Sequence, residues 1–281
     1  MTLSARQLRE LMADNGLHPS RALGQNFVGD PNTVRRIARL ASIGPGDRVV
    51  EIGAGLGSLS LALAETGASV TAVEVDRYLV PVLRSVVADA GVAVVEGDAL
   101  HLDWQELLAP PGPPWTLVAN LPYNIATPLV ADLLDEVGAI GRMLVMVQRE
   151  VGERLAATVG DPAYGAVSVK VAYWASARIA GRVPASVFVP QPKVESVLVA
   201  IERHPRPAVD PQVVPAGDLF ALVRAGFAQR RKMLRRSLAA FGVDDGVWEA
   251  AGVAPSARAE ELDVAAWGRL AAAIASPVVA R

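Results

Sequence analysis

The sequence predicts a doubly wound α/β fold with a mostly parallel, seven-stranded sheet, followed by a small C-terminal helical domain. Short apolar runs alternate with helical patterns over most of the chain, which is typical of parallel strands joined by covering helices. A glycine-rich turn follows the first of these strand-like runs, as expected where such a sheet binds a ligand. A proline-rich segment then separates this region from a last part that contains only helical patterns.

Two helices are expected before the first strand. Ser4 to Ala13 has a helical pattern that Asn15-Gly16 closes. A second helix runs from Pro31 to about Ser42, because Asp30 can cap it and proline favours the first helical position. The segment Gly44-Pro45-Gly46 stops this helix.

Seven strands are expected after these helices. Five of them alternate with helices and lie at residues 48–52, 69–75, 92–95, 115–121 and 143–147. The intervening helices lie at residues 58–65, 77–88 and 127–136. Because such strands are parallel, a ligand should lie over their carboxyl ends. Residues 178–183 and 197–201 would form an antiparallel pair at one edge, and residues 164–174 fit either a helix or a strand.

The chain is expected to divide into three parts. Residues 205–217 contain four prolines, and this density suits neither a helix nor a central strand, so they are interpreted as a linker. Residues 1–204 would form the ligand-binding domain and residues 218–281 a helical domain. Helices in the latter are expected near residues 219–227, 232–241 and 264–274.

The composition excludes several kinds of site. The chain has 281 residues, 52% of them hydrophobic, and no cysteine, which excludes disulfides and thiolate metal sites. Its three histidines lie far apart without ligand spacing, so we expect no metal. No apolar run approaches the roughly 20 residues that span a bilayer, and residues 1–10 lack the apolar core of a secretory signal. We therefore expect a soluble, cytoplasmic protein without membrane contact.

The charge distribution singles out one basic run. A net charge of −2 and a pI of about 6.0 argue by themselves against a nucleic-acid binder. Six basic residues without an acidic one nevertheless follow one another between residues 224 and 236. A solvated helix face is one explanation, but we favour contact with RNA phosphates because no acid within the run neutralises it. The six residues are Arg224, Arg230, Arg231, Lys232, Arg235 and Arg236.

The tetrapeptide Asn120-Leu121-Pro122-Tyr123 is the most informative motif, and it follows the apolar end of a predicted strand. The Asn120 side-chain oxygen and the Leu121 carbonyl can accept the two hydrogens of a flat exocyclic amine, such as N6 of adenine. Tyr123 can stack on the same base, which is worth about 1–3 kcal/mol. The motif therefore indicates a site for an adenine base.

Residues 51–58 indicate the cofactor. Their G-x-G-x-G turn suits S-adenosylmethionine, whereas the dinucleotide pattern needs Gly or Ala where Ser58 stands. Glu74 ends the second strand of the sheet, where it can accept hydrogen bonds from both ribose hydroxyls. Asp98 ends the third, where it can accept one from N6 of the cofactor's adenine. Each acid alone could be an ordinary strand-end cap, and an FAD or NAD site is the alternative.

With these residues the chain resembles the ribosomal RNA adenine N6,N6-dimethyltransferases, specifically the small-subunit type that modifies 16S rRNA. The resemblance extends over nearly the whole chain. The motifs that carry it are residues 24–27 (GQNF), 51–55 (EIGAG), 120–128 (NLPYNIATP), 148–151 (QREV), 163–165 (AYG), 188–196 (FVPQPKVES) and 227–232 (FAQRRK). The family's usual proline is replaced by Ala54 and its usual serine by Ala126, and neither change affects the expected chemistry.

The resemblance implies a class I S-adenosylmethionine-dependent methyltransferase fold, with residues 1–204 as the catalytic domain. The implied catalytic residues are Asn120, Leu121, Pro122, Tyr123 and Phe188. Phe188 would cover a flipped adenine opposite Tyr123, although from the sequence alone it could equally be a core residue. The implied cofactor contacts are Gln25, Asn26, Val28, Gly53, Gly55, Glu74, Asp98, Ala99 and Asn120.

The implied reaction is dimethylation at N6 of two adjacent adenines near the 3′ end of 16S rRNA, by a monomer acting on an immature 30S subunit. Two alternatives are a 23S rRNA adenine methyltransferase of the antibiotic-resistance type and a non-catalytic ribosome-assembly factor. Tyr164-Gly165 and residues 188–196 fit the small-subunit type better, and an intact 120–123 motif favours catalysis. A DNA adenine methyltransferase fits less well because no extra recognition domain is present, and a dinucleotide oxidoreductase fits least.

Overall fold

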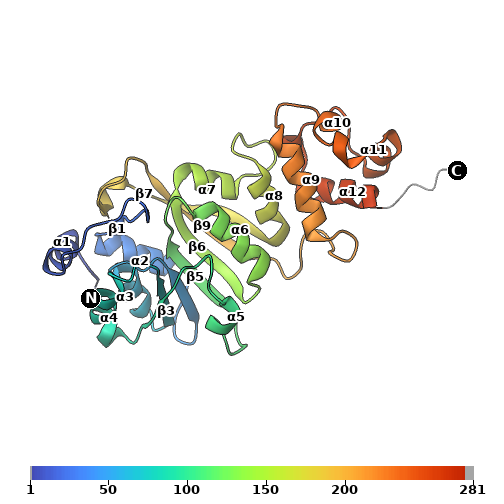
Figure 1. The fold of residues 1–281 in the computed structure, drawn as a ribbon. Helices are drawn as coiled ribbons and strands as arrows, with labels where there is room; N and C mark the ends of the chain where they lie inside the picture. Colours follow the sequence, from blue (N-terminus) through green and yellow to red (C-terminus); the bar gives the residue numbers. More distant parts are fainter. Residues whose placement is uncertain (1, 276–281) are drawn as a thin grey trace. The chain divides into compact units, whose positions relative to one another are not determined.

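The computed structural model describes residues 2–275, and the chain forms two compact units (Figure 1). The first unit comprises Met1–Gly152 and Arg178–Arg203, and the second comprises Glu153–Ala177 and His204–Arg281. The second unit therefore combines the C-terminal part from His204 onward with the segment Glu153–Ala177, which the sequence analysis assigned to the larger domain. The reason is hydrophobic, because Val169 and Tyr173 from that segment are fully buried in the core of the helical unit.

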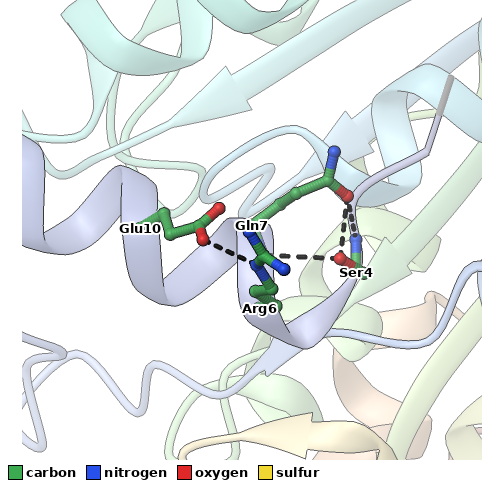
Figure 2. A network of polar contacts seen from close by, with 4 residues as sticks. All are labelled: Ser4, Arg6, Gln7 and Glu10. Carbon is green, nitrogen blue, oxygen red and sulfur yellow. Dashed lines mark hydrogen bonds and ion pairs between the residues drawn. The ribbon is translucent and has the colours of Figure 1, made fainter.

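The first helix, α1 (Ala5–Asp14), begins with a capping box that Figure 2 shows. The Ser4 amide and hydroxyl donate to Gln7 Oε1 at 2.9 and 2.8 Å, and the Ser4 hydroxyl also accepts from the Gln7 amide. Arg6 and Glu10 form an exposed ion pair one turn apart, at 2.7 Å. Leu8 on the same helix is fully buried, so the cap fixes where α1 enters the core.

A seven-stranded sheet forms the centre of the first unit, as the sequence predicts, and its strand order is β4-β3-β2-β5-β6-β9-β7. Neighbouring strands from β4 to β6 are parallel, and β9 runs antiparallel to β6. The strands are β2 (Arg48–Ile52), β3 (Ser69–Glu74), β4 (Ala93–Glu96), β5 (Trp115–Asn120), β6 (Ile140–Gln148), β7 (Ala175–Val183) and β9 (Ser196–Arg203). The last two predicted strands are neighbours at one edge of the sheet.

Helices cover both faces of this sheet (Figure 1). On one face, α2 and α3 share a hydrophobic cluster with Val118 and Leu198. On the other face, Gly152 of α7 lies against Val147 and Val199, with no room for a Cβ. The helices are α2 (Pro31–Leu40), α3 (Ser58–Ala64), α4 (Val80–Val87), α5 (Trp104–Leu107), α6 (Ala126–Glu136) and α7 (Arg149–Ala156). The short helices α5 and α7 were not expected from the sequence.

A second, two-stranded sheet joins β1 (Phe27–Val28) to β8 (Phe188–Val189), and no pattern in the sequence predicted it. Phe27 lies opposite Val189 and Val28 opposite Phe188 in an antiparallel pair. Strands of two residues carry no readable period, and these two are far apart in the chain. The pairing fixes the segment that packs against the glycine turn, since a Cβ on Gly55 would meet the Phe27 ring.

The second unit consists of helices around an aromatic core. The helices are α8 (Ala166–Trp174), α9 (Ala216–Ala228), α10 (Leu234–Ser237), α11 (Asp245–Ala251) and α12 (Val264–Ala275). Trp267 is fully buried in this core, and Gly226 of α9 lets the helix approach its ring. The proline-rich segment also belongs to this unit, since Val214 is buried against the same core. Within residues 2–275, no helix is long and apolar enough to cross a membrane.

Candidate active site

A cavity opens at the carboxyl ends of β2, β3 and β5, where the sequence predicted a ligand. Each of these strands delivers a functional group directly, because the chain leaves the sheet there. They are Gly53 after β2, Glu74 at the end of β3 and Asn120 at the end of β5. The lining residues are Leu23, Gly24, Gln25, Asn26, Phe27, Gly53, Gly55, Glu74, Val75, Asn120, Leu121, Pro122 and Tyr123.

The glycine turn needs its glycines for two different reasons. Gly53 has a φ of +71° and Gly55 a φ of +59°, values that residues with a Cβ rarely adopt. At Gly55 there is also no space, because a Cβ would lie 2.8 Å from the Phe27 ring. The turn therefore brings its backbone close to the cavity and packs directly on β1.

Glu74 is held by the turn beside it. Its two carboxylate oxygens accept from the amides of Gly55 at 2.7 Å and Asp76 at 2.9 Å. Burial raises the pKa of Glu74, and the two amide hydrogen bonds oppose this shift. Each carboxylate oxygen has a second lone pair. The group can therefore still accept hydrogen bonds from a ligand that carries vicinal hydroxyls.

Asn120 has one defined orientation in the cavity. Its Nδ2 donates to the backbone carbonyl of Asn26 at 2.8 Å, which leaves Oδ1 as the group that can accept from a ligand. The Leu121 amide donates to the Met146 carbonyl of β6 at 3.0 Å. This bond fixes the peptide that follows Asn120. The two acceptors predicted for an exocyclic amine thus belong to a segment anchored to the sheet.

Tyr123 completes the wall next to Asn120. Its hydroxyl lies 3.0 Å from the Ser196 hydroxyl on β9, a fully buried group. Burial raises the pKa of Tyr123, while the contact with Ser196 opposes that shift. Burial is the larger effect, so the pKa stays above its usual value of 10 and the phenol is neutral near pH 7. The ring is therefore an uncharged surface for stacking.

Residues 20–26 form a strap along the cavity. Both polar atoms of the Gln25 side chain are hydrogen-bonded: Oε1 accepts from the Ser20 amide at 2.7 Å, and Nε2 donates to Asp76 at 2.8 Å. At the other end, Asn124 donates to the Ala22 carbonyl at 3.3 Å. Gln25 therefore lines the cavity, and its Nε2 ties the strap to the segment after Glu74 while its Oε1 closes a bond within the strap.

The structure does not bring every predicted residue to this cavity. Asp98 follows β4, and the Leu100 amide, then the His101 ring, hold its pKa below the usual value. Ala99 is buried beside it. Neither lines the cavity, so the contact of Asp98 with the cofactor's adenine and that of Ala99 with the cofactor stay predictions.

Val28 and Phe188 lie elsewhere. They are 4% and 3% exposed and share one hydrophobic cluster, where the β1–β8 pairing places them opposite each other. Val28 lines a smaller neighbouring cavity, to which Glu51 and Asn120 also contribute. Phe188 is therefore a core residue in this structure, which was the alternative to a stacking role in the sequence analysis. Its side chain lines neither of these two cavities.

Several residues of the site were not expected. Glu51 is buried at the smaller cavity, where its carboxyl bonds to Ser60 and burial raises its pKa to about 8. The Gly-rich motif contains this residue, but its burial depends on the packing of α3. Four residues line the larger cavity without having been predicted, namely Leu23, Gly24, Phe27 and Val75. Gly24 and Phe27 belong to the motif at residues 24–27, Leu23 precedes that motif and Val75 follows Glu74, and this proximity was the available signal.

The basic residues of the C-terminal run are exposed in the second unit, and one of them is engaged within it. Arg230 forms an ion pair with Glu260 at 2.6 Å and donates to the Pro162 carbonyl at 2.8 Å. The sequence could not show this pairing, because the acid lies 30 residues away. Arg230 therefore ties two loops of the unit together.

Comparisons with known proteins show which family the chain resembles. The model of the family described as "Ribosomal RNA adenine dimethylase" matches residues 18–276. Ribosomal RNA small subunit methyltransferase A of Thermobifida fusca is 48% identical over 279 residues, which cover 96% of this chain and 95% of that protein. A dimethyladenosine transferase from Plasmodium falciparum shares the fold, with a TM-score of 0.72 at 24% identity over 86% of this chain and 94% of that chain.

The 23S rRNA methyltransferase ErmE also matches, with a TM-score of 0.69 at 25% identity over 89% of this chain and 100% of that chain. The fold of the first unit and the match over nearly the whole sequence lead to the same assignment. The chain therefore belongs to the ribosomal RNA adenine dimethylase family and is an S-adenosylmethionine-dependent methyltransferase.

Proposed function

We propose that the chain dimethylates N6 of two adjacent adenines near the 3′ end of 16S rRNA, within an immature 30S subunit. The observation that carries the proposal is the fixed amide of Asn120, whose Oδ1 is left to accept beside the Tyr123 ring. The relative that is 48% identical bears the name of a small-subunit methyltransferase, which favours 16S over 23S rRNA as the substrate. We further expect a cytoplasmic monomer that acts without a metal.

S-adenosylmethionine, when bound, supplies an electrophilic methyl group. The residues present fit this cofactor, because Glu74 offers carboxylate lone pairs for the ribose hydroxyls and Gly53 and Gly55 offer a backbone without side chains. Asn26 lines the same cavity, where its backbone carbonyl accepts the hydrogen bond from Asn120 Nδ2. Asp98 and Ala99 would contact the adenine of the cofactor from the loop after β4.

The chain's own part in the reaction is to hold and prepare the target amine. The N6 lone pair of adenine is delocalised into the ring and is a poor nucleophile. Hydrogen bonds from the amine to Asn120 Oδ1 and to the Leu121 carbonyl favour a tetrahedral nitrogen and free the lone pair. Tyr123 stacks on the base after it has left its helix, which offsets an unstacking cost of a few kcal/mol.

No general base is required by this proposal. The proton that the amine loses can pass to water, because the cavity is open to solvent on one side. Proximity and orientation then supply much of the rate enhancement. As placed, Phe188 supports β1 from the core, and a stacking role would require its side chain to leave that cluster.

Contacts with the RNA backbone are assigned to the members of the C-terminal run other than Arg230. These are Arg224, Arg231, Lys232, Arg235 and Arg236. Arg230 would support them from its bonds with Glu260 and Pro162 rather than bind phosphate itself.

The test is methyl transfer from labelled S-adenosylmethionine to undermethylated 30S subunits, with 50S subunits and naked 23S rRNA in parallel. We expect N6,N6-dimethyladenine in 16S rRNA alone. Label in 23S rRNA would favour the resistance-type reaction instead. Absence of label in every RNA, with the cofactor still bound, would indicate an assembly factor without catalysis.

A further inference from the structure

The contact between Tyr123 and Ser196 joins the adenine-binding motif to a distant strand. Tyr123 lines the cavity, and its hydroxyl oxygen lies 3.0 Å from Ser196 Oγ, 73 residues further along the chain. Ser196 is the first residue of β9 and is 0% exposed. Its hydroxyl therefore has no access to solvent, and the phenol is the partner that the structure gives it.

Both ends of this contact are anchored on the same sheet. Ser196 lies opposite Gln148 in the antiparallel β6–β9 pair. Two residues earlier on β6, the Met146 carbonyl accepts from the Leu121 amide at 3.0 Å. The Arg149 amide continues the pairing by donating to the Glu195 carbonyl at 3.0 Å. Strand β6 thus holds the tetrapeptide on one side and Ser196 on the other.

We propose that Ser196 is a positioning residue, which sets the plane of the Tyr123 ring and thereby the plane of the target adenine. A tyrosine ring is attached at one end only, and its hydroxyl lies at the opposite end. A bond there to an immobile partner restricts both the tilt of the ring and its side-chain rotation. This inference rests on the proposed function, in which Tyr123 stacks on the base.

Ring orientation matters more for the second methyl transfer than for the first. Unmethylated adenine offers two N–H hydrogens, so both acceptors at residues 120 and 121 help to align it. The monomethylated amine has one hydrogen left and must enter in a rotated form, so it relies more on the stacking surface. A tilted Tyr123 should therefore favour release of the monomethylated product.

A purely structural role for Ser196 is the competing explanation, since a buried hydroxyl is normally hydrogen-bonded whatever its function. Ser168 provides the matched control. It is also a buried serine, 1% exposed, and its hydroxyl donates to the Arg154 carbonyl at 2.6 Å in the helical unit. The same hydroxyl also accepts from the Gly165 amide at 3.1 Å, so Ser168→Ala removes two hydrogen bonds of a buried serine without touching Tyr123.

The experiment compares wild type, Ser196→Ala, Tyr123→Phe, the double variant and Ser168→Ala on undermethylated 30S subunits. Single-turnover transfer gives the rate, and mass spectrometry gives the ratio of mono- to dimethylated adenine. We expect Ser196→Ala and Tyr123→Phe each to slow the second transfer by about tenfold, the scale of one lost positioning hydrogen bond. The double variant should match either single variant. The KM for S-adenosylmethionine should be that of wild type in all these variants. Ser168→Ala should also keep the product ratio of wild type.

A second measurement does not depend on the RNA substrate. The four tyrosines can be labelled with ¹³C in their rings, and Tyr123→Phe identifies the signal of Tyr123. We expect the ring to be rigid in wild type and mobile in Ser196→Ala. A rigid ring in Ser196→Ala would overturn the inference, as would a product ratio unchanged from that of Ser168→Ala. Wild type without methyl transfer to 16S rRNA would instead contradict the proposed function, and the ring measurement would still decide the role of Ser196.

Discussion

Asn120 Nδ2 donates to the backbone carbonyl of Asn26 at 2.8 Å, and this bond joins the adenine-binding motif to the strap of residues 20–26. The two residues lie 94 positions apart in the chain. One side chain thus serves two purposes, because its nitrogen holds the strap while its oxygen remains available to a substrate amine. The same bond determines which way the amide points.

Replacing Asn120 should remove both functions at once. We expect Asn120→Ala to lower the rate of methyl transfer by more than about 100-fold, the scale found when one preorganised polar group is removed from an active site. Asn124→Ala is the matched control, since it loses only the strap bond to the Ala22 carbonyl. It should retain most of the activity. Single-turnover assays measure both variants, and ordinary turnover by Asn120→Ala would refute the role of its oxygen.

The sequence predicted the parts of this site that lie at the ends of strands. Gly53, Glu74 and Asn120 follow or end short apolar runs, and parallel strands bring such ends together. The strap could not be placed in this way, because it is held by single side-chain bonds such as that of Gln25 with Asp76. No local pattern in the sequence records a pairing over such a separation.

Packing decided the other differences. Phe188 is buried through a two-residue strand, which is too short to show a period. Val169 and Tyr173 joined the helical unit because their apolar surfaces are buried there, although the sequence left their segment ambiguous between helix and strand. Amphipathic patterns show that a face is buried, but they do not identify the partner that buries it.

Gly55→Ala should damage the protein more than the same change at another glycine with positive φ. At Gly55 the left-handed backbone costs about 1–2 kcal/mol with a Cβ present, and the new methyl group would also meet the Phe27 ring at 2.8 Å. Gly91, with a φ of +68° and nothing within 4 Å of its Cβ position, is the control for the backbone term alone. Urea unfolding and calorimetric titration with S-adenosylmethionine measure the two effects.

For Gly55→Ala we expect a larger loss of stability than for Gly91→Ala, together with weaker cofactor binding. Gly91→Ala should bind the cofactor as wild type does. Equal losses of stability in the two variants would show that the ring of Phe27 yields without cost. Unchanged cofactor affinity in Gly55→Ala would argue against the turn as the cofactor site.

Glu51 should make stability depend on pH. Burial raises its pKa from an ordinary value of 4.5 to about 8. Between these two values the folded protein keeps the proton and the unfolded chain has lost it, so the folded state binds more protons. Stability must then fall as the pH rises through this window, by at most roughly 1.4 kcal/mol per pH unit from this one group.

Glu51→Gln removes the titration and keeps a neutral side chain of similar shape beside Ser60. We expect its free energy of unfolding to change less between about pH 5 and about pH 8 than that of wild type. Glu74, whose pKa is also raised by burial, contributes in the same direction to both proteins and largely cancels in the comparison. Urea titrations at several pH values provide the slopes. Parallel slopes in the two proteins would mean that Glu51 is ionised in the fold.

The basic run should act through phosphates, which makes its contribution dependent on salt. Arg231 and Lys232 are exposed in the turn between α9 and α10, and replacing both with glutamine removes two charges. If each contacts one phosphate, the slope of log affinity against log salt should decrease in magnitude by about 1.4–1.8.

The control for the change in net charge is the pair Arg39→Gln with Arg84→Gln, which removes two exposed charges from the first unit. Binding of 30S subunits at several salt concentrations gives the slopes, with cofactor affinity as a check on folding. A smaller slope in the control pair as well would assign the effect to net charge, and an unchanged slope in the first pair would make the run a solvated helix face.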